Sequence, residues 1–172
     1  WTERRAVLST HPTYSTGTVS VSLSTRTTVS GTGTLWDTEV TGMGVMNANL
    51  GGKLVLSGET EVYTVADVAS DTAITLTDNY IGATALSLAS YLYFEDEYTL
   101  ATDFEDLIDG RWFDEDETIT LIGPQEFYRN YSRNSRRGRP RHSTLIELGP
   151  STTADLRRRV VFGPAPDKTY RF

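Results

Sequence analysis

The chain has 172 residues, no cysteine and a formal net charge of −7. Disulfide bonds, cysteine-bound zinc and thiol nucleophiles are therefore excluded, and no apolar run approaches the ~20 residues that a membrane-spanning helix needs. The length fits one globular domain, or a small domain that carries an inserted second one.

Charge is distributed unevenly along the chain. Residues 1–128 carry five Lys or Arg against twenty Asp or Glu, whereas residues 129–172 carry eleven against three. Such an asymmetry indicates charged surfaces that meet a polyanion or the opposite end of an identical neighbour. The chain begins at Trp1 and stops at Phe172 within strand-like sequence, so we expect the natural protein to be longer.

Strand patterns dominate the chain. Residues 18–23 alternate Val and Leu with Thr and Ser, which is the period of two of a half-buried strand. Asp67, Ser70 and Asp71 are typical turn formers between two such runs. Roughly ten short strands separated by glycines favour a β-sandwich or β-barrel over an α/β fold. The other main predicted strands cover residues 62–65, 73–77, 90–94, 117–122, 143–148 and 156–162.

Two short helices are predicted. In residues 103–109 the apolar side chains Phe104, Leu107 and Ile108 recur at the i, i+3 and i+4 positions of one helical face. The second helix begins at Pro124 and places Phe127 on one face with Tyr131, and both helices are short enough to need packing against a sheet.

The composition predicts an insertion. Residues 25–94 form a Gly- and Thr-rich run of short strands with few basic residues, which we interpret as an inserted small β-barrel module. Residues 1–24 and 95–172 would then form one β-rich body. The expected fold class is mainly β, with a sandwich or barrel body, the inserted barrel and the two short helices.

Three stretches of the body carry motif-like patterns. Residues 97–107 are similar to a Tyr-x-Leu-Pro-x-Asp-Phe-x-x-Leu step from a strand into a helical turn, with Ala101 in place of the usual Pro. Residues 138–146 are similar to a Gly-x-Pro-x-Tyr-Tyr-x-Leu strand entry, with His142 and Ser143 at the aromatic positions. Residues 161–170 are similar to a Leu-x-Pro-x-Pro-Asp-x-x-Tyr hairpin. Together these stretches resemble a family of tailed-bacteriophage neck proteins, the head–tail adaptors or connectors.

This resemblance implies a structural role and no cofactor. The expected function is that of a subunit of a head-to-tail connector ring, which joins the portal to the tail and lines the DNA passage of the virion. The implied partners are further copies of the chain (a dozen, by the family's usual symmetry), the portal protein, tail or other neck proteins, and phage DNA without sequence preference. No membrane partner is expected, assembly would take place in the cytoplasm of the host bacterium, and the family's portal-contacting helices would precede Trp1.

A cluster of arginines is the sharpest single feature. Six arginines fall within thirteen residues and are separated by Ser, Asn, Gly and Pro, which predicts an exposed, mobile loop that becomes ordered on assembly. Three interpretations are open: a contact with the acidic face of a neighbouring subunit, a contact with DNA phosphates, or a solvated loop. These candidate interface residues are Arg129, Arg133, Arg136, Arg137, Arg139 and Arg141.

Two runs of acidic residues are the candidate partners of these arginines. Paired carboxylates can also serve acid–base catalysis or bind calcium, but the second run lacks the Gly and the spaced ligands of an EF-hand loop. We therefore expect a solvated or subunit-facing surface. The acidic residues concerned are Glu95, Asp96, Glu97, Asp114, Glu115, Asp116 and Glu117.

The sequence carries no recognisable catalytic constellation. The two histidines, His11 and His142, lie outside any metal or triad pattern and are expected at the surface or in turns. Neither a Gly-x-Ser-x-Gly elbow nor a phosphate-binding Gly-rich loop is present, so the chain is predicted not to be an enzyme.

An alternative function is a tail or fibre module that binds a host surface glycan. It would require exposed aromatic side chains that stack on sugars, although aromatic residues at strand spacing more often belong to a core. The candidate aromatic residues are Trp36, Phe94, Tyr98 and Trp112.

Overall fold

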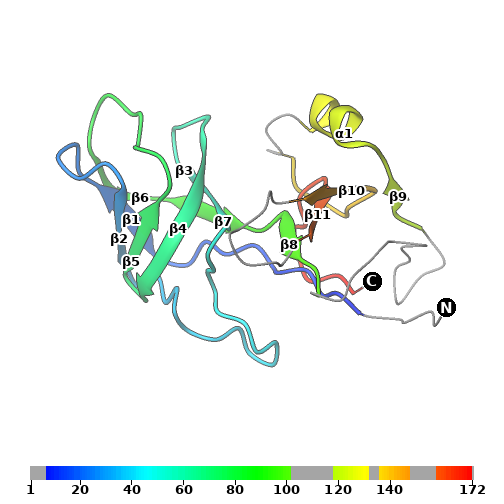
Figure 1. Ribbon diagram of the computed structural model, residues 1–172. Helices are drawn as coiled ribbons and strands as arrows, with labels where there is room; N and C mark the ends of the chain where they lie inside the picture. The colour runs from blue at the N-terminus through cyan, green and yellow to red at the C-terminus, as the bar shows by residue number, and fades with distance from the viewer. Residues whose placement is uncertain (1–6, 102–117, 132–135, 148–157, 172) are drawn as a thin grey trace, which may run out of the picture. The chain divides into compact units, whose positions relative to one another are not determined.

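The computed structural model describes residues 7–101, 118–131, 136–147 and 158–171, which form two compact units. Residues Thr13–Phe94 make up one, called here the barrel unit. Trp1–Pro12 and Glu95–Phe172 make up the other, called here the sheet unit. Strands predominate in both, so the prediction of a mainly-β fold is confirmed (Figure 1).

The barrel unit is a seven-stranded antiparallel sheet with the order β6-β1-β2-β5-β4-β3-β7. Its strands are β1 (Thr18–Val21), β2 (Thr28–Thr32), β3 (Lys53–Leu56), β4 (Val62–Ser70), β5 (Ala73–Leu76), β6 (Leu86–Ala89) and β7 (Tyr91–Phe94).

The two ends of this sheet meet. Tyr14 and Tyr93 exchange two backbone hydrogen bonds, of 2.9 and 2.7 Å, so the segment before β1 pairs with β7. The pairing continues in the adjacent strands, because Val19 and Val21 of β1 pair with β6, the strand directly before β7. Because β7 is also paired with β3, the sheet curls back on itself as a small barrel with few exposed edges.

Alternation along the strands places the core inside the barrel. In β1, β3 and β5 the buried Val, Leu and Ile side chains alternate with half-buried positions, as a strand period of two requires. Trp36 is fully buried and its indole nitrogen donates to the Tyr91 hydroxyl at 3.0 Å. The same hydroxyl donates to the Thr16 carbonyl at 2.7 Å, so both polar aromatic groups are satisfied inside the core.

Within the described residues, the sheet unit has four strands and one helix. The strands β8 (Glu97–Thr99), β11 (Arg158–Gly163), β10 (His142–Glu147) and β9 (Thr120–Leu121) lie in that order. Only β9, on β10, is parallel to its neighbour. The helix α1 (Pro124–Asn130) packs on β10 and buries Phe127. Tyr98, Ile119, Val160 and Phe162 form the main cluster of this core.

The structure divides the chain at Thr13 rather than at the predicted residue 25, while the other boundary follows Phe94 as in the sequence interpretation. The reason is that β1, expected in the body, pairs with β2 and β6. Asp67 lies within β4 and not in a turn, because a register shift beside it lets the strand continue to Ser70. The predicted helix at residues 103–109 lies outside the described residues.

Candidate assembly surface

The arginine segment follows α1 and leads into β10. Arg129 occupies the last turn of α1 and is exposed, where a cation is favoured by the helix dipole. Arg136 and Arg141 are also exposed, whereas Arg137 and Arg139 are half-buried. Arg133 lies outside the described residues.

The backbone of residues 136–141 forms hydrogen bonds with residues 163–165 and with Thr120 of β9. The amide of Gly138 donates to the carbonyl of Ala165 at 2.9 Å, and the amide of Ala165 donates to the carbonyl of Arg136 at 3.1 Å. Arg141 donates to Gly163 at 3.0 Å and accepts a bond from Thr120, also at 3.0 Å. The described part of the segment is thus hydrogen-bonded to its neighbours, and the expectation that it becomes ordered on assembly stays a prediction.

Burial distinguishes the arginines from one another. Burial lowers the pKa of the Arg137 guanidinium, which nevertheless stays protonated because an arginine titrates far above neutral pH. Arg136 and Arg141 present their guanidinium groups from a fixed backbone, so fewer conformations are lost when they bind an anionic group.

An aromatic cradle supports the start of this segment. The hydroxyl of Tyr131, the C-cap of α1, forms a 2.7 Å hydrogen bond with Nδ1 of His142 in β10. The Tyr131 ring covers Gly163, where an added Cβ would lie 2.6 Å from a ring carbon. Glycine is thus required at this position, and the peptide bond from it to Pro164 is cis.

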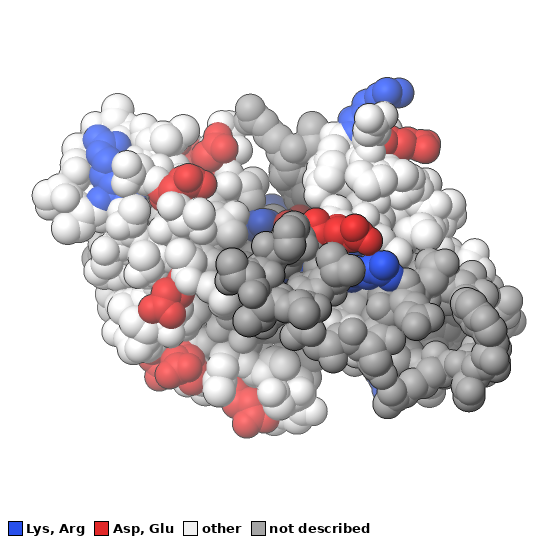
Figure 2. Space-filling model, viewed as in Figure 1, with Lys and Arg blue, Asp and Glu red and all other residues white. Residues whose placement is uncertain are grey.

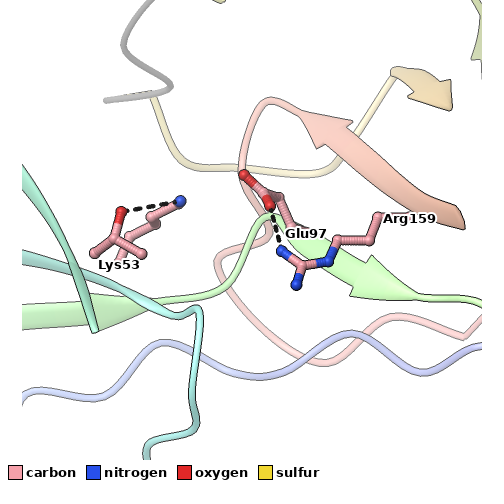
Figure 3. A network of polar contacts seen from close by, with 4 residues as sticks. Lys53, Glu97 and Arg159 are labelled. Carbon is pink, nitrogen blue, oxygen red and sulfur yellow. Dashed lines mark hydrogen bonds and ion pairs between the residues drawn. The ribbon is translucent and has the colours of Figure 1, made fainter. Parts of the chain in front are cut away.

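The first acidic run is part of the sheet unit and is only partly exposed. Asp96 has 6% of its surface exposed, and its carbonyl accepts a 2.9 Å bond from the Phe162 amide. The Glu97 carboxylate pairs with Arg159 at 3.2 Å, as Figure 3 shows, and Glu95 is half-buried. A contact between this run and another subunit stays a prediction. Residues 114–117 lie outside the described residues.

The basic run on β11 is internally paired. Arg159 reaches Glu97 on β8, and Arg158 lies 3.4 Å from Glu147 on β10. The two arginines are neighbours in sequence and reach partners on the two strands that flank β11. Figure 3 also draws Lys53 of the barrel unit, whose ammonium donates to Thr64 at 3.3 Å.

Histidine positions differ from the sequence expectation. His11 is buried, and its amide donates to the Tyr98 hydroxyl at 2.9 Å. Burial raises the pKa of Tyr98, with the charge of Glu95 acting in the same direction, so the phenol stays neutral and donates to the Glu95 carbonyl. His142 is half-buried beside Tyr131. Both histidines therefore form hydrogen bonds within the fold, which the composition alone does not reveal.

Among the described residues, the candidate aromatic side chains are unavailable for sugar stacking. Trp36 and Phe94 have no exposed surface and Tyr98 has 9% exposed. Trp112 lies outside the described residues. Within those same ranges, no three His, Asp or Glu side chains group in a way that could hold a metal ion, and no helix is long and apolar enough to cross a membrane.

Comparisons with known proteins add no identification: no family model, curated protein or solved structure matches the chain. Function is therefore argued from the arrangement of its own residues.

Proposed function

We propose that the chain is a structural subunit of the neck of a tailed bacteriophage, where copies of it form a ring between the portal and the tail. Its role is assembly, and a ring in that position surrounds the passage for DNA. The subunit would belong to the virion and require no cofactor.

One observation carries this proposal. The three stretches that resemble head–tail adaptors contribute to one four-stranded sheet, although they are far apart in sequence. The first supplies β8, the second leads into β10 and supplies most of it, and the third overlaps the end of β11. The resemblance therefore lies within a single structural unit, as a shared fold of this region requires.

The arginine segment supports the same role. Its backbone is hydrogen-bonded to the end of β11, to Ala165 and to Thr120 of β9. The exposed guanidinium groups therefore lie beside the sheet on which the resemblance rests. Figure 2 shows acidic side chains over the barrel unit, which has seven Asp or Glu and two Lys or Arg. Opposite charges on one protomer suit the head-to-tail contacts that close a ring.

The test is the mass of the chain in solution, measured by light scattering alone and mixed with portal protein, at low and high salt. We expect an oligomer, formed either by the chain alone or only on the portal, whose stability falls at high salt because exposed charge pairs are screened. A monomer or trimer that ignores both salt and the portal would overturn the proposal. The glycan-binding alternative has no exposed candidate aromatic among the described residues.

A further inference from the structure

The connection between β2 and β3 forms an ordered hairpin outside the seven strands of the barrel. Residues 35–50 are called here the β2–β3 hairpin, and backbone bonds join its two arms: the Val40 amide donates to the Val45 carbonyl at 2.7 Å, and the Asn47 amide donates to the Thr38 carbonyl at 2.9 Å. Gly42 and Gly44 have positive φ angles of 77° and 67°, which the tight turn at the tip requires. The hairpin projects beyond the ends of the barrel strands (Figure 1).

The base of the hairpin is anchored in the barrel core. Ala48 donates to the carbonyl of the buried Trp36 at 3.0 Å, and the amide of Asn49 donates to the Tyr93 hydroxyl at 2.7 Å. At the other end, Gly44 donates to the Glu39 carboxylate at 3.1 Å. Loops held this firmly at the base offer a preorganised surface.

Several large apolar side chains of this hairpin are exposed. Leu50 is 75% exposed, and Leu35, Val45 and Met46 are between 37% and 48% exposed. Four exposed large apolar residues within sixteen positions of one ordered loop are more than the isolated exposed residues expected on a monomer. Such a surface indicates contact with another protein.

The charge beside these residues indicates the occupant. Between residues 27 and 52 the chain carries two carboxylates, Asp37 and Glu39, and no Lys or Arg. The complementary surface exists on the same protein, because Arg136 and Arg141 stand exposed on a fixed backbone. Arginine stems cover apolar surface while their guanidinium groups bind carboxylates, so one side chain can satisfy both features of the hairpin.

We propose that the β2–β3 hairpin of one copy docks on residues 136–141 of a second copy, with its exposed apolar side chains against the arginine stems and its carboxylates against the guanidinium groups. This inference rests on the proposed function, since two different surfaces that complement each other form the heterologous contact that closes a ring. The inference goes beyond the proposed function because it names the two surfaces that meet in the ring.

The test uses two full-chain variants, each with one surface damaged. Asp37→Arg with Leu50→Ser alters the hairpin, and Arg136→Ser with Arg141→Ser alters the arginine segment without creating charges that the altered hairpin could bind; all four side chains are exposed. The matched control is Asp78→Arg with Ile81→Ser, an exposed acid and an exposed apolar residue elsewhere on the barrel unit. Circular dichroism checks that each variant is folded.

Self-association is measured by sedimentation velocity under the conditions in which the parental chain assembles. Each surface variant should associate at least about tenfold more weakly than the parental chain, and the control should associate as the parental chain does. An equimolar mixture of the two surface variants retains one intact hairpin and one intact arginine segment, so it should form dimers and stop there.

Each other outcome overturns the inference. Normal assembly of the hairpin variant, or a mixture that forms no dimer, means that these two surfaces do not meet. Loss of portal binding without loss of self-association assigns the hairpin to the portal, and loss of DNA binding as the only defect of the arginine variant assigns that segment to DNA. Failure of the parental chain to assemble under any condition contradicts the proposed ring function itself.

Discussion

The two units differ in whether the edge strands of their sheets are paired. The barrel unit curls until Tyr14 pairs with Tyr93, and this leaves few backbone groups available to another chain. The sheet unit stays open within the described residues, with β8 and the two-residue β9 as its outer strands. The barrel unit is also acidic, whereas the Lys and Arg residues of the chain are concentrated near the C-terminal strands of the sheet unit.

This difference suggests a division of roles. A closed sheet is stable by its own core and presents its loops, such as the β2–β3 hairpin, as contact surfaces. An open sheet with fixed arginines beside it is suited to receiving a partner.

Trp36→Ala should unfold the barrel unit selectively. Trp36 is fully buried and hydrogen-bonded to Tyr91, so its loss should lower the free energy of unfolding of this unit by about 3–5 kcal/mol. Hydrogen exchange should show a loss of amide protection in residues 13–94 and no loss in β10 and β11. Phe162→Ala is the matched variant in the sheet unit, and equal loss of protection in both units from either change would show that they do not fold separately.

Alkaline pH should destabilise both units, because each contains tyrosines whose pKa is raised by burial. Burial raises the pKa of three phenols of the barrel unit, Tyr63, Tyr80 and Tyr91, above the ordinary value of 10.0. It does the same for Tyr98 and Tyr128 in the sheet unit. Below pH 10 these phenols are neutral in both folded and unfolded chains. As the pH rises above 10 they ionise first in the unfolded chain, so folding stability falls.

Chemical denaturation between pH 8 and pH 11 measures this effect. Tyr80→Phe removes one of the three groups of the barrel unit and should make the decline shallower, at the expense of the 3.0 Å bond to Glu59. An unchanged slope in this variant would contradict the assignment.

Gly163→Ala should destabilise the sheet unit by about 1–3 kcal/mol, because the new Cβ meets the Tyr131 ring. The decisive control is the same change in a Tyr131→Ala background, where the ring is absent and the added cost should vanish. A cost that persists in that background would mean that the steric contact is not its cause. Urea denaturation supplies the free energies for this double-mutant cycle.

The smallest expected effects come from the two ion pairs of β11. Glu97→Gln should lower the free energy of unfolding by about 1 kcal/mol, because the pair with Arg159 is largely shielded from solvent. Glu147→Gln should cost roughly 0–0.5 kcal/mol, because the side chain of Glu147 is 63% exposed. Equal costs at the two positions, measured by the same urea titration, would show that shielding does not separate these pairs.

The strands could be predicted from the sequence because their alternation is local. Residues 18–23, 62–65 and 73–77 show the period of two plainly, and the structure places β1, β4 and β5 there. Closure of the barrel depends on Tyr14 and Tyr93, which are far apart in sequence and carry no pattern that pairs them. Topology of this kind is determined by contacts that no local window contains.

The residues of the candidate site could be predicted from the sequence, but the conformation of the segment that carries them could not. The spacing of the arginines with Gly138 and Pro140 favoured a mobile loop, whereas the described part of the segment is hydrogen-bonded to residues 163–165. The β2–β3 hairpin received no functional assignment from the sequence. The sequence does contain a signal for this hairpin: Gly42 and Gly44 lie on either side of Met43, and closely spaced glycines are typical of hairpin turns.

The most direct test of the ring is native mass spectrometry of the chain assembled alone or with portal protein. A closed ring predicts one stoichiometry that does not grow with protein concentration, because every hairpin and every arginine segment is then occupied. A monomer at all concentrations, or a continuous ladder of open oligomers, would contradict the account.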